Sequence, residues 1–466
     1  MRRRLRMTAD QHARLAAHVL APDGCEAAAV LICGRGRGDD AEVLTVREVH
    51  PVPYEACPVR EPDRLTWRTE TIAPLVARAA KEGLAVVKAH GHPGGRRAFS
   101  PTDDAADREL FRSVHGWTDD GRPHGSLVVV PGGECIARFV DEAGAFAPVD
   151  LVTVVGDDLR LFWRDAVATG PPGFARRHAQ AFGEGTADAL RRLSVAVVGV
   201  SGTGGPVVEQ LQRLGVGRLV LVDPDRVEEL NLNRIPHATR DDALRKRPKV
   251  DVAAEAVRRT GLGTEVVTYA RNLKDPEVVR AIATCDLVFG CMDGAEGRHL
   301  LNRLATFYVL PYIDVGVRLD ADGRGGVSQI CGSIHWLTPG GSSLLSRGVI
   351  SLDEVAAEGL RRQSPAEYRR RREEKYIKGI REDRPAVVSV NTTFAGLAVT
   401  ELLARLHPFR DDGNAPCARL TCTLSQVRFE CAEDGPPCPV LARHVGRGDV
   451  VPLLLDPELS ETERAA

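Results

Sequence analysis

A glycine-rich turn between a charge-free apolar run and a helix is the feature that most limits what this 466-residue chain can fold into. The run Val195–Val198 lacks polar alternation, which is typical of a parallel strand covered on both faces. The turn GVSGTGG and an amphipathic helix follow, and a second apolar run, Leu219–Val222, ends at Asp223. This order predicts the first strand–helix–strand unit of a doubly wound, Rossmann-like α/β domain.

The same turn predicts a nucleotide site. Glycines allow the backbone to approach a phosphate closely, and the N–H groups at the helix start face its negative charge. Asp223 follows the second strand, where a carboxylate can accept hydrogen bonds from ribose hydroxyls. Ser201 stands at the second glycine of a dinucleotide fingerprint, so the turn alone does not select the nucleotide.

The polar residues beyond Asp223 favour a triphosphate. Asn231 and Arg234 come shortly after Asp223. A dehydrogenase has no use for these two side chains at this place, whereas an enzyme that binds a triphosphate needs them to contact the phosphates. Lys249 adds a cation, and Asp293 adds an acid able to hold Mg²⁺. The predicted nucleotide-binding residues are Gly199, Gly202, Gly204, Asp223, Asp225, Asn231, Arg234, Lys249 and Asp293.

With these motifs, the sequence from Phe174 to near Leu406 resembles the ThiF/MoeB family of ATP-dependent activating enzymes, which includes the ubiquitin-activating enzymes. The resemblance implies that ATP and Mg²⁺ are bound and that a protein's C-terminus is adenylated. It implies catalytic roles for Arg234 and Asp293. By position, Arg177 matches the family's arginine that reaches the ATP of a partner subunit, which implies a homodimer. The alternative for Arg177 is a solvated arginine pair in a linker helix.

A second informative segment runs from His90 to Asp103. His90 and His92 end a buried strand, and residues two apart on an extended chain point to the same side. Ser100 and the proline after it have the form of a helix start that can turn Asp103 back toward the histidines. Two imidazoles and one carboxylate leave a fourth tetrahedral position for water, as in catalytic zinc sites. Each part taken alone is more often a helix cap or a hydrogen-bonded loop.

Zinc acidifies its bound water, so a nearby carboxylate must take the proton. Glu26, which leads into the first buried strand, is the candidate base. The spacing H-x-H-x7-S-x-x-D with an upstream glutamate resembles the JAB/JAMM metalloprotease family, whose members often cleave ubiquitin-like proteins from their conjugates. The resemblance covers Thr8 to Phe162 and implies zinc on His90, His92 and Asp103, and an oxyanion donor in Ser100.

Composition limits the classes of partner. A net charge of −2 gives no reason to expect nucleic acid or an anionic membrane surface. No run of about eighteen apolar residues occurs and the N-terminus lacks the apolar core of a signal peptide, so we expect a cytoplasmic protein. Eleven irregularly spaced cysteines fit reduced thiols rather than a disulfide framework.

The predicted architecture is an α+β JAB/JAMM domain at 1–167, a linker at 168–173 and a ThiF-type domain at 174–410. A loosely packed C-terminal extension, 411–466, is expected after it. Within the ThiF-type domain, Glu354–Lys378 reads as a solvated helix and Ala386–Leu406 as a buried closing helix.

The sequence departs from the family at two paired C-x-x-C motifs that bind a structural zinc in relatives. Their positions hold Ser343, Ser346, Cys438 and Leu441, so we expect zinc in the first domain only. The crossover region between residues 338 and 385 has no cysteine to accept the activated acyl group. Three outcomes stay open: the reaction stops at the acyl-adenylate, Cys438 accepts the acyl group, or a crossover serine does.

Together the two resemblances imply one enzyme with two active sites. It would activate a ubiquitin-like protein with a C-terminal Gly-Gly, and would cleave that protein's precursor or conjugates. Similar fusions belong to bacterial ubiquitin-like conjugation operons, which implies a carrier-type conjugating partner and a role in antiphage defence. The alternatives are activation of a sulfur-carrier protein for thiamine, molybdopterin or cysteine-type biosynthesis, and a non-catalytic scaffold that binds a ubiquitin-like protein.

Overall fold

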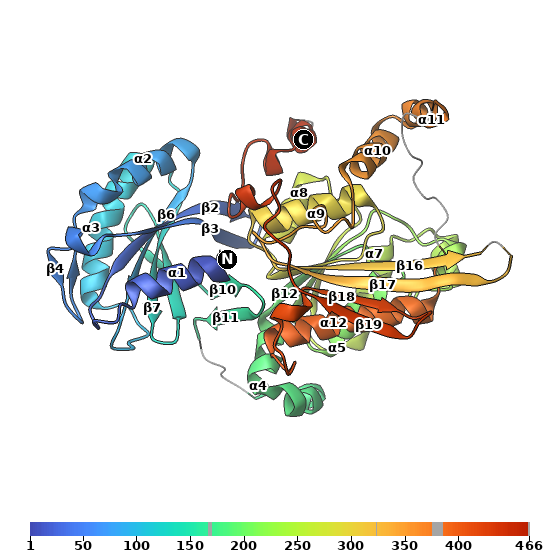
Figure 1. The fold of residues 1–466 in the computed structure, drawn as a ribbon, viewed down its shortest axis with the longest axis horizontal. Coiled ribbons are helices and arrows are strands. Elements are labelled where there is room, and N and C mark those ends of the chain that lie inside the picture. Colours follow the sequence, from blue (N-terminus) through green and yellow to red (C-terminus); the bar gives the residue numbers. More distant parts are fainter. Residues whose placement is uncertain (166–169, 323, 375–384, 465–466) are drawn as a thin grey trace. The chain divides into compact units, whose positions relative to one another are not determined.

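The computed structural model describes residues 1–165, 170–322, 324–374 and 385–464. The chain forms two compact units, each built on its own mixed β-sheet (Figure 1). Unit 1 comprises Met1–Ala166, Phe307–Val309 and His444–Leu455, and unit 2 comprises Val167–Thr306, Leu310–Arg443 and Asp456–Ala466. Among the helices described, none combines the length and apolarity that a membrane span requires.

Unit 1 has a nine-stranded sheet in the order β11-β10-β1-β3-β2-β6-β7-β8-β9. One buried cluster contains the apolar face of α1, and a second contains those of α2 and α3. The hairpin β4–β5 forms a separate small sheet. The elements are β1 (Arg2–Thr8), α1 (Ala9–Val19), β2 (Ala28–Arg37), β3 (Ala41–Pro51), β4 (Val59–Arg60), β5 (Leu65–Thr66), α2 (Ala73–Glu82), β6 (Ala85–Gly91), α3 (Pro101–Thr118), β7 (His124–Val130), β8 (Glu134–Val140), β9 (Phe146–Pro148), β10 (Leu151–Val155) and β11 (Leu159–Trp163).

Unit 2 has an eight-stranded sheet in the order β14-β13-β12-β15-β16-β17-β18-β19. Its first five strands are parallel and the last three antiparallel to their neighbours. The strands are β12 (Ser194–Val198), β13 (Arg218–Val222), β14 (Glu265–Tyr269), β15 (Leu287–Gly290), β16 (Tyr312–Ala321), β17 (Val327–Leu337), β18 (Arg419–Thr423) and β19 (Arg428–Ala432). The helices are α4 (Arg176–Arg192), α5 (Gly204–Arg213), α6 (Arg240–Leu244), α7 (Lys249–Thr260), α8 (Pro276–Ala283), α9 (Ala295–Phe307), α10 (Leu352–Gln363), α11 (Pro365–Glu373), α12 (Val388–Leu406) and α13 (Pro457–Arg464).

This architecture confirms the predicted fold class, an α+β unit followed by a Rossmann-like α/β unit. The predicted solvated helix at Glu354–Lys378 is two helices, α10 and α11, separated at Ser364, because Pro365 cannot continue the first one. Residues 375–378 of that prediction, and residues 168 and 169 of the predicted linker, lie outside the described residues.

The residues predicted as a loose C-terminal extension are packed. The strands β18 and β19 continue the sheet of unit 2. The segment His444–Leu455 belongs to unit 1, where the Gly446 carbonyl accepts hydrogen bonds from Gly34 N (3.0 Å) and Thr45 Oγ1 (3.1 Å). A Cβ on Gly34 would lie 2.3 Å from the Gly446 oxygen, so only glycine permits this approach. Looseness was therefore the wrong expectation for these stretches.

The expectation that the cysteines are reduced thiols is wrong for one pair. Cys417 and Cys431 form a disulfide, and the other nine cysteines are free. Cys431 lies on β19 and Cys417 lies two residues before β18, and their Cα atoms are 4.7 Å apart. A sequence separation of 14 does not reveal this proximity.

Candidate functional site

The glycine-rich turn joins β12 to α5 at the carboxyl end of the parallel strands. Gly199 has a φ of +89°, which side-chain-bearing residues rarely adopt. A Cβ on Gly204 would lie 1.8 Å from the Gly199 carbonyl oxygen. Glycine is thus required at 199 for the backbone conformation and at 204 for the packing of the helix start onto the turn.

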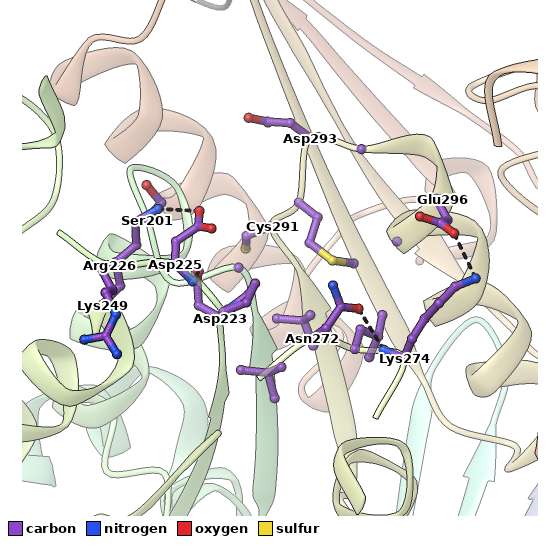
Figure 2. A pocket seen from close by; sticks show the side chains of 18 of the residues that line it. Ser201, Asp223, Asp225, Arg226, Lys249, Asn272, Lys274, Cys291, Asp293 and Glu296 are labelled. Carbon is purple, nitrogen blue, oxygen red and sulfur yellow. Dashed lines mark hydrogen bonds and ion pairs between the residues drawn. The ribbon is translucent and has the colours of Figure 1, made fainter. Parts of the chain in front are cut away.

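A pocket of about 630 Å³ lies beside this turn (Figure 2). Its walls include most of the predicted nucleotide-binding residues, whereas Gly202 and Gly204 are not among the lining residues. The predicted residues in the lining are Gly199, Asp223, Asp225, Asn231, Arg234, Lys249 and Asp293.

Asp223 connects the turn to the second strand. Its carboxylate accepts hydrogen bonds from Val200 N at 2.7 Å and Asp225 N at 2.9 Å. The residue is only 4% exposed, and burial raises the pKa of its carboxyl group. A carboxylate has about four acceptor positions, so these two bonds leave acceptor capacity for a ribose hydroxyl.

The cationic side of the pocket is built on the segment after β13. Lys249 Nζ donates to Asp225 Oδ2 at 2.8 Å, and the lysine is almost fully buried. Asn231 Oδ1 accepts from Glu228 N, which fixes the short helix Glu229–Asn231, and Arg234 N donates to the Asn231 carbonyl at 3.1 Å in the turn that follows. Phosphate oxygens entering the pocket would therefore meet an amide and two cations held by local hydrogen bonds.

One part of the pocket lining was not predicted from the sequence. Asn272 and Lys274 follow β14 and line the cavity together with Glu296 (Figure 2). Lys274 Nζ pairs with Glu296 Oε1 at 2.8 Å, and Glu296 N donates to Glu358 of α10 at 2.8 Å. The rule that ligands bind at the carboxyl ends of parallel strands could have identified the residues after β14.

Two further residues singled out from the sequence, Arg177 and Cys438, are not in the lining of this pocket. Arg177 is an exposed residue of α4 and is not in the lining of the pocket; its predicted role concerns a second copy of the chain and stays a prediction. Cys438, an open candidate for the acyl acceptor, is 1% exposed. Burial acts to raise the pKa of this thiol, but hydrogen bonds with Ser343 and with nearby backbone groups lower it overall.

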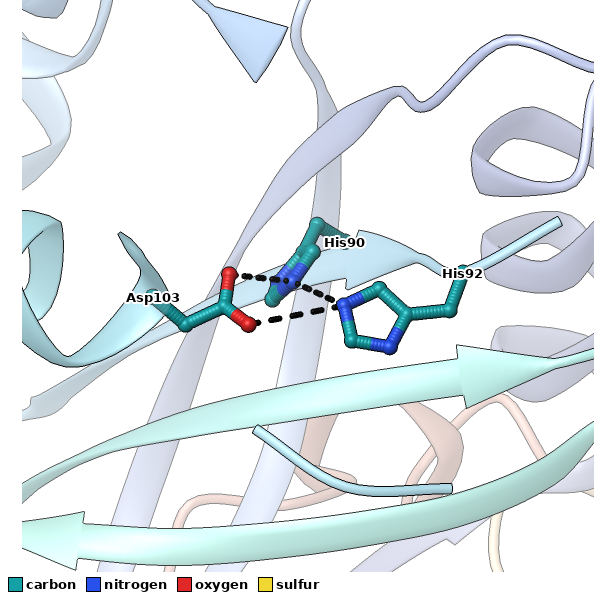
Figure 3. A group of neighbouring side chains, drawn as sticks. All are labelled: His90, His92 and Asp103. Carbon is teal, nitrogen blue, oxygen red and sulfur yellow. Dashed lines mark hydrogen bonds and ion pairs between the residues drawn. The ribbon is translucent and has the colours of Figure 1, made fainter. Parts of the chain in front are cut away.

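In unit 1, His90, His92 and Asp103 converge on one point (Figure 3). The two Nε2 atoms are 3.0 Å apart, His90 Nε2 is 3.0 Å from Asp103 Oδ1, and His92 Nε2 is 3.5 Å from Oδ2. The predicted helix start is confirmed, because Ser100 caps α3 and forms a reciprocal capping box with Asp103.

The donor set fits a tetrahedral zinc ion. Zinc–ligand bonds of about 2.0–2.1 Å place neighbouring ligand atoms roughly 3.3 Å apart, close to the observed separations. His92 Nδ1 faces the Arg96 carbonyl oxygen at 2.8 Å and therefore carries the ring proton, which leaves the Nε2 lone pair directed at the cluster. The two histidine rings and the Ser100 N–H hold the pKa of Asp103 below its usual range despite burial.

Glu26 and Ser100 flank this cluster. Glu26 Oε1 is 3.9 Å from His92 Nε2, and burial raises the pKa of the glutamate to about 7. Ser100 Oγ donates to Asp103 Oδ2 at 2.7 Å, so its predicted role as an oxyanion donor requires a change of partner. An adjoining cavity of about 530 Å³ is also lined by Trp67 and Lys88, which sequence reasoning did not identify.

The fold and the two clusters define a two-unit α/β protein with a nucleotide-type pocket in one unit and a His–His–Asp metal-type cluster in the other. The ThiF family matches residues 175–436, more than half of the chain, and the chain belongs to this family. The family of prokaryotic homologs of the JAB domain matches residues 8–139, so the chain combines both domains.

Individual curated proteins match this chain over shorter stretches than the ThiF family does. The chain is 32% identical over 163 residues to ubiquitin-like modifier-activating enzyme 5 of Culex quinquefasciatus, covering 32% of this chain and 38% of that protein. It is 39% identical over 113 residues to adenylyltransferase and sulfurtransferase MOCS3 of Bos taurus, covering 24% of each. The matches thus span well under half of these relatives. A crystal structure of E. coli MccB with MccA-N7isoASN has a TM-score of 0.46 and 17% identity, over 59% of this chain and 75% of that chain.

Proposed function

We propose that unit 2 uses Mg-ATP to adenylate the C-terminal carboxylate of a ubiquitin-like protein ending in Gly-Gly. The observation that carries this proposal is the convergence of Asp223, Arg234, Lys249 and Asp293 on one pocket beside the glycine turn. Membership of the ThiF family and the activating enzymes among the relatives support it.

In the proposed reaction, the carboxylate of the ubiquitin-like protein attacks the α-phosphate and pyrophosphate leaves. Arg234 and Lys249 stabilise the charge that spreads over the phosphate oxygens. Asp293 would hold Mg²⁺, which supplies further charge neutralisation when bound. Asp223 orients the ribose, and Arg177 reaches the phosphates of a partner copy in a homodimer.

We further propose that unit 1 hydrolyses a peptide or isopeptide bond at the C-terminus of the same protein. His90, His92 and Asp103 would hold zinc, which lowers the pKa of a bound water. Glu26 takes the proton of the attacking water, from a position 3.9 Å from His92 Nε2 at the edge of the cluster. Ser100 donates to the oxyanion.

Pyrophosphate exchange with a Gly-Gly-ending ubiquitin-like protein tests the first proposal. We expect exchange in the full chain, loss of at least about 100-fold in Asp293→Ala, and wild-type exchange in His90→Ala. Exchange that survives Asp293→Ala would reject Asp293 as the metal-binding acid. No exchange with any such protein would favour the scaffold alternative.

Cleavage of a ubiquitin-like protein with a C-terminal fusion tests the second proposal. We expect Glu26→Gln to retain stoichiometric zinc and to lose cleavage by at least about 100-fold, because only the proton acceptor is removed. A Glu26→Gln protein that binds zinc and still cleaves would reject Glu26 as the base.

The MOCS3 relatives support sulfur-carrier activation as a second candidate function. Both functions share the adenylation step and differ in the acceptor. Capture of the acyl group on a conjugating partner protein would favour ubiquitin-like conjugation, whereas formation of a C-terminal thiocarboxylate would favour sulfur transfer.

A further inference from the structure

A buried cluster of charges lies next to the His–His–Asp cluster of unit 1. Asp107 is fully buried and pairs through Oδ1 with Lys88, whose side chain is 8% exposed. Arg138 Nη2 donates to Asp107 Oδ2 at 2.7 Å, and its other terminal nitrogen pairs with Asp104. Lys88 of β6 and Arg138 of β8 therefore hold the first two turns of α3 against the sheet.

The Arg138 guanidinium is itself fixed by aromatic rings. It lies 3.9 Å from the ring centroid of Phe99 and 3.7 Å from that of Phe146. Phe99 directly precedes Ser100, the N-cap of α3. Arg138 therefore contacts both the loop that enters the helix and the helix itself, which restricts where α3 begins.

The spacing of the contacts links this charge cluster to the metal-type cluster. Lys88 and His90 are two residues apart on β6, a rise of about 6.6 Å on one face of the strand. Asp103 and Asp107 are four residues apart on α3, a rise of about 6.0 Å on one face of the helix. Because these spacings nearly match, the pair Lys88–Asp107 sets α3 against β6 at the register that places Asp103 beside His90.

We propose that Lys88, Asp107 and Arg138 are positioning residues that hold Asp103 in place for binding of a metal ion. This inference rests on the zinc site proposed above. Asp107 is not among the three residues whose ligand atoms converge. We infer that Lys88, Asp107 and Arg138 act through the placement of α3. Loss of such outer partners typically weakens metal affinity about 10–100-fold.

The test measures zinc affinity of the full chain by competition with a chelator, and the ligand-field absorption of bound cobalt(II). We expect Asp107→Asn to weaken zinc binding at least about 10-fold and to alter the cobalt spectrum, because two cations lose their shared carboxylate. We expect Lys88→Met, which leaves the Arg138 pair intact, to act in the same direction, and it replaces Asp107→Asn if that variant does not fold.

Val114→Ala is the matched control. Val114 is a buried residue of the same helix in the second apolar cluster, and it lies about two turns beyond Asp107. We expect this variant to lower unfolding stability and to leave zinc affinity within about twofold of wild type. Pyrophosphate exchange should be unchanged in every variant, which reports that unit 2 is folded.

Wild-type zinc affinity and an unchanged cobalt spectrum in a folded Asp107→Asn protein would overturn the inference. Equal loss of affinity in Val114→Ala would also overturn it, because general destabilisation would then explain the effect. If wild type binds no zinc, or if His90→Ala leaves zinc binding unchanged, the proposed zinc site fails and the inference fails with it. The His90→Ala arm therefore separates the two failures.

Discussion

His124 is a buried imidazole in unit 1 whose protonation state is fixed by its neighbours. Val86 N donates to Nδ1 at 3.0 Å, so the ring proton is on Nε2, which donates to Thr118 Oγ1 at 3.1 Å. Burial lowers the pKa of His124 well below its ordinary value, and the charges of Arg35 and Arg122 add to the effect. A proton on Nδ1 would remove the acceptor of the Val86 N–H.

This arrangement predicts that unit 1 loses stability in acid. The unfolded chain binds a proton at His124 near pH 6.5 and the folded chain does not, so stability is complete above pH 6.5 and falls below it. At pH 5.5, His124 alone should cost about 1.4 kcal/mol. Urea unfolding at pH 7.5 and 5.5 can be followed by tryptophan fluorescence, because Trp67, Trp117 and Trp163 lie in unit 1.

The matched variant for this measurement is His124→Asn, whose Oδ1 can accept from Val86 N but does not titrate. We expect its stability to fall less than that of wild type between the two pH values, by about the contribution of one histidine. An equal fall in both proteins would show that other groups cause the acid sensitivity.

The site residues differ in how far the sequence could predict them. His90, His92 and Asp103 were predicted to converge because strand alternation and a helix cap are local rules, and the structure brings them together. The pair Lys88–Asp107 was not predicted, because it depends on the register between a helix and a strand. The position of a helix along a strand that is distant in the sequence cannot be predicted from a local sequence pattern.

The turn that begins α5 has no room for a side chain at Gly204. We expect Gly204→Ala to weaken ATP binding at least about 10-fold and to destabilise unit 2 by about 1–3 kcal/mol, because its Cβ would lie 1.8 Å from the Gly199 oxygen. Isothermal titration with ATP and thermal unfolding measure the two effects.

Gly185→Ala is the control, since a Cβ there meets nothing within 4 Å and Gly185 lies within α4. We expect unchanged ATP affinity and a stability equal to or about 0.5–1 kcal/mol above wild type. ATP affinity equal to wild type in Gly204→Ala would mean that the turn can relax around an added methyl group.

The same local rules explain which elements were foreseen. The strands β12 and β13 are continuous apolar runs, so their burial was readable from the sequence. The strand β1 was missed because four of its seven residues are arginine, although it lies inside the sheet between β3 and β10. Its parallel partner Leu151–Val155 is far along the chain, so the pairing that stabilises β1 has no local signal.

At the scale of the whole molecule, the two sites belong to units with separate cores. We therefore expect their variants to act independently. His90→Ala should lose zinc and cleavage and keep pyrophosphate exchange, and Asp293→Ala should do the reverse. Removal of zinc with 1,10-phenanthroline in excess Mg²⁺ should abolish cleavage and leave exchange within about twofold of the untreated protein. Loss of both activities in either variant would show that the sites are coupled.

The assignment of His444–Leu455 to unit 1 has a practical consequence for dissecting the protein. If the chain were divided at the linker, the N-terminal fragment would lack His444–Leu455, a segment of its own unit that comes from the other fragment. Adding a synthetic peptide with the sequence of His444–Leu455 to that fragment should restore the hydrogen bonds to Gly34 and Thr45, in the manner of fragment complementation.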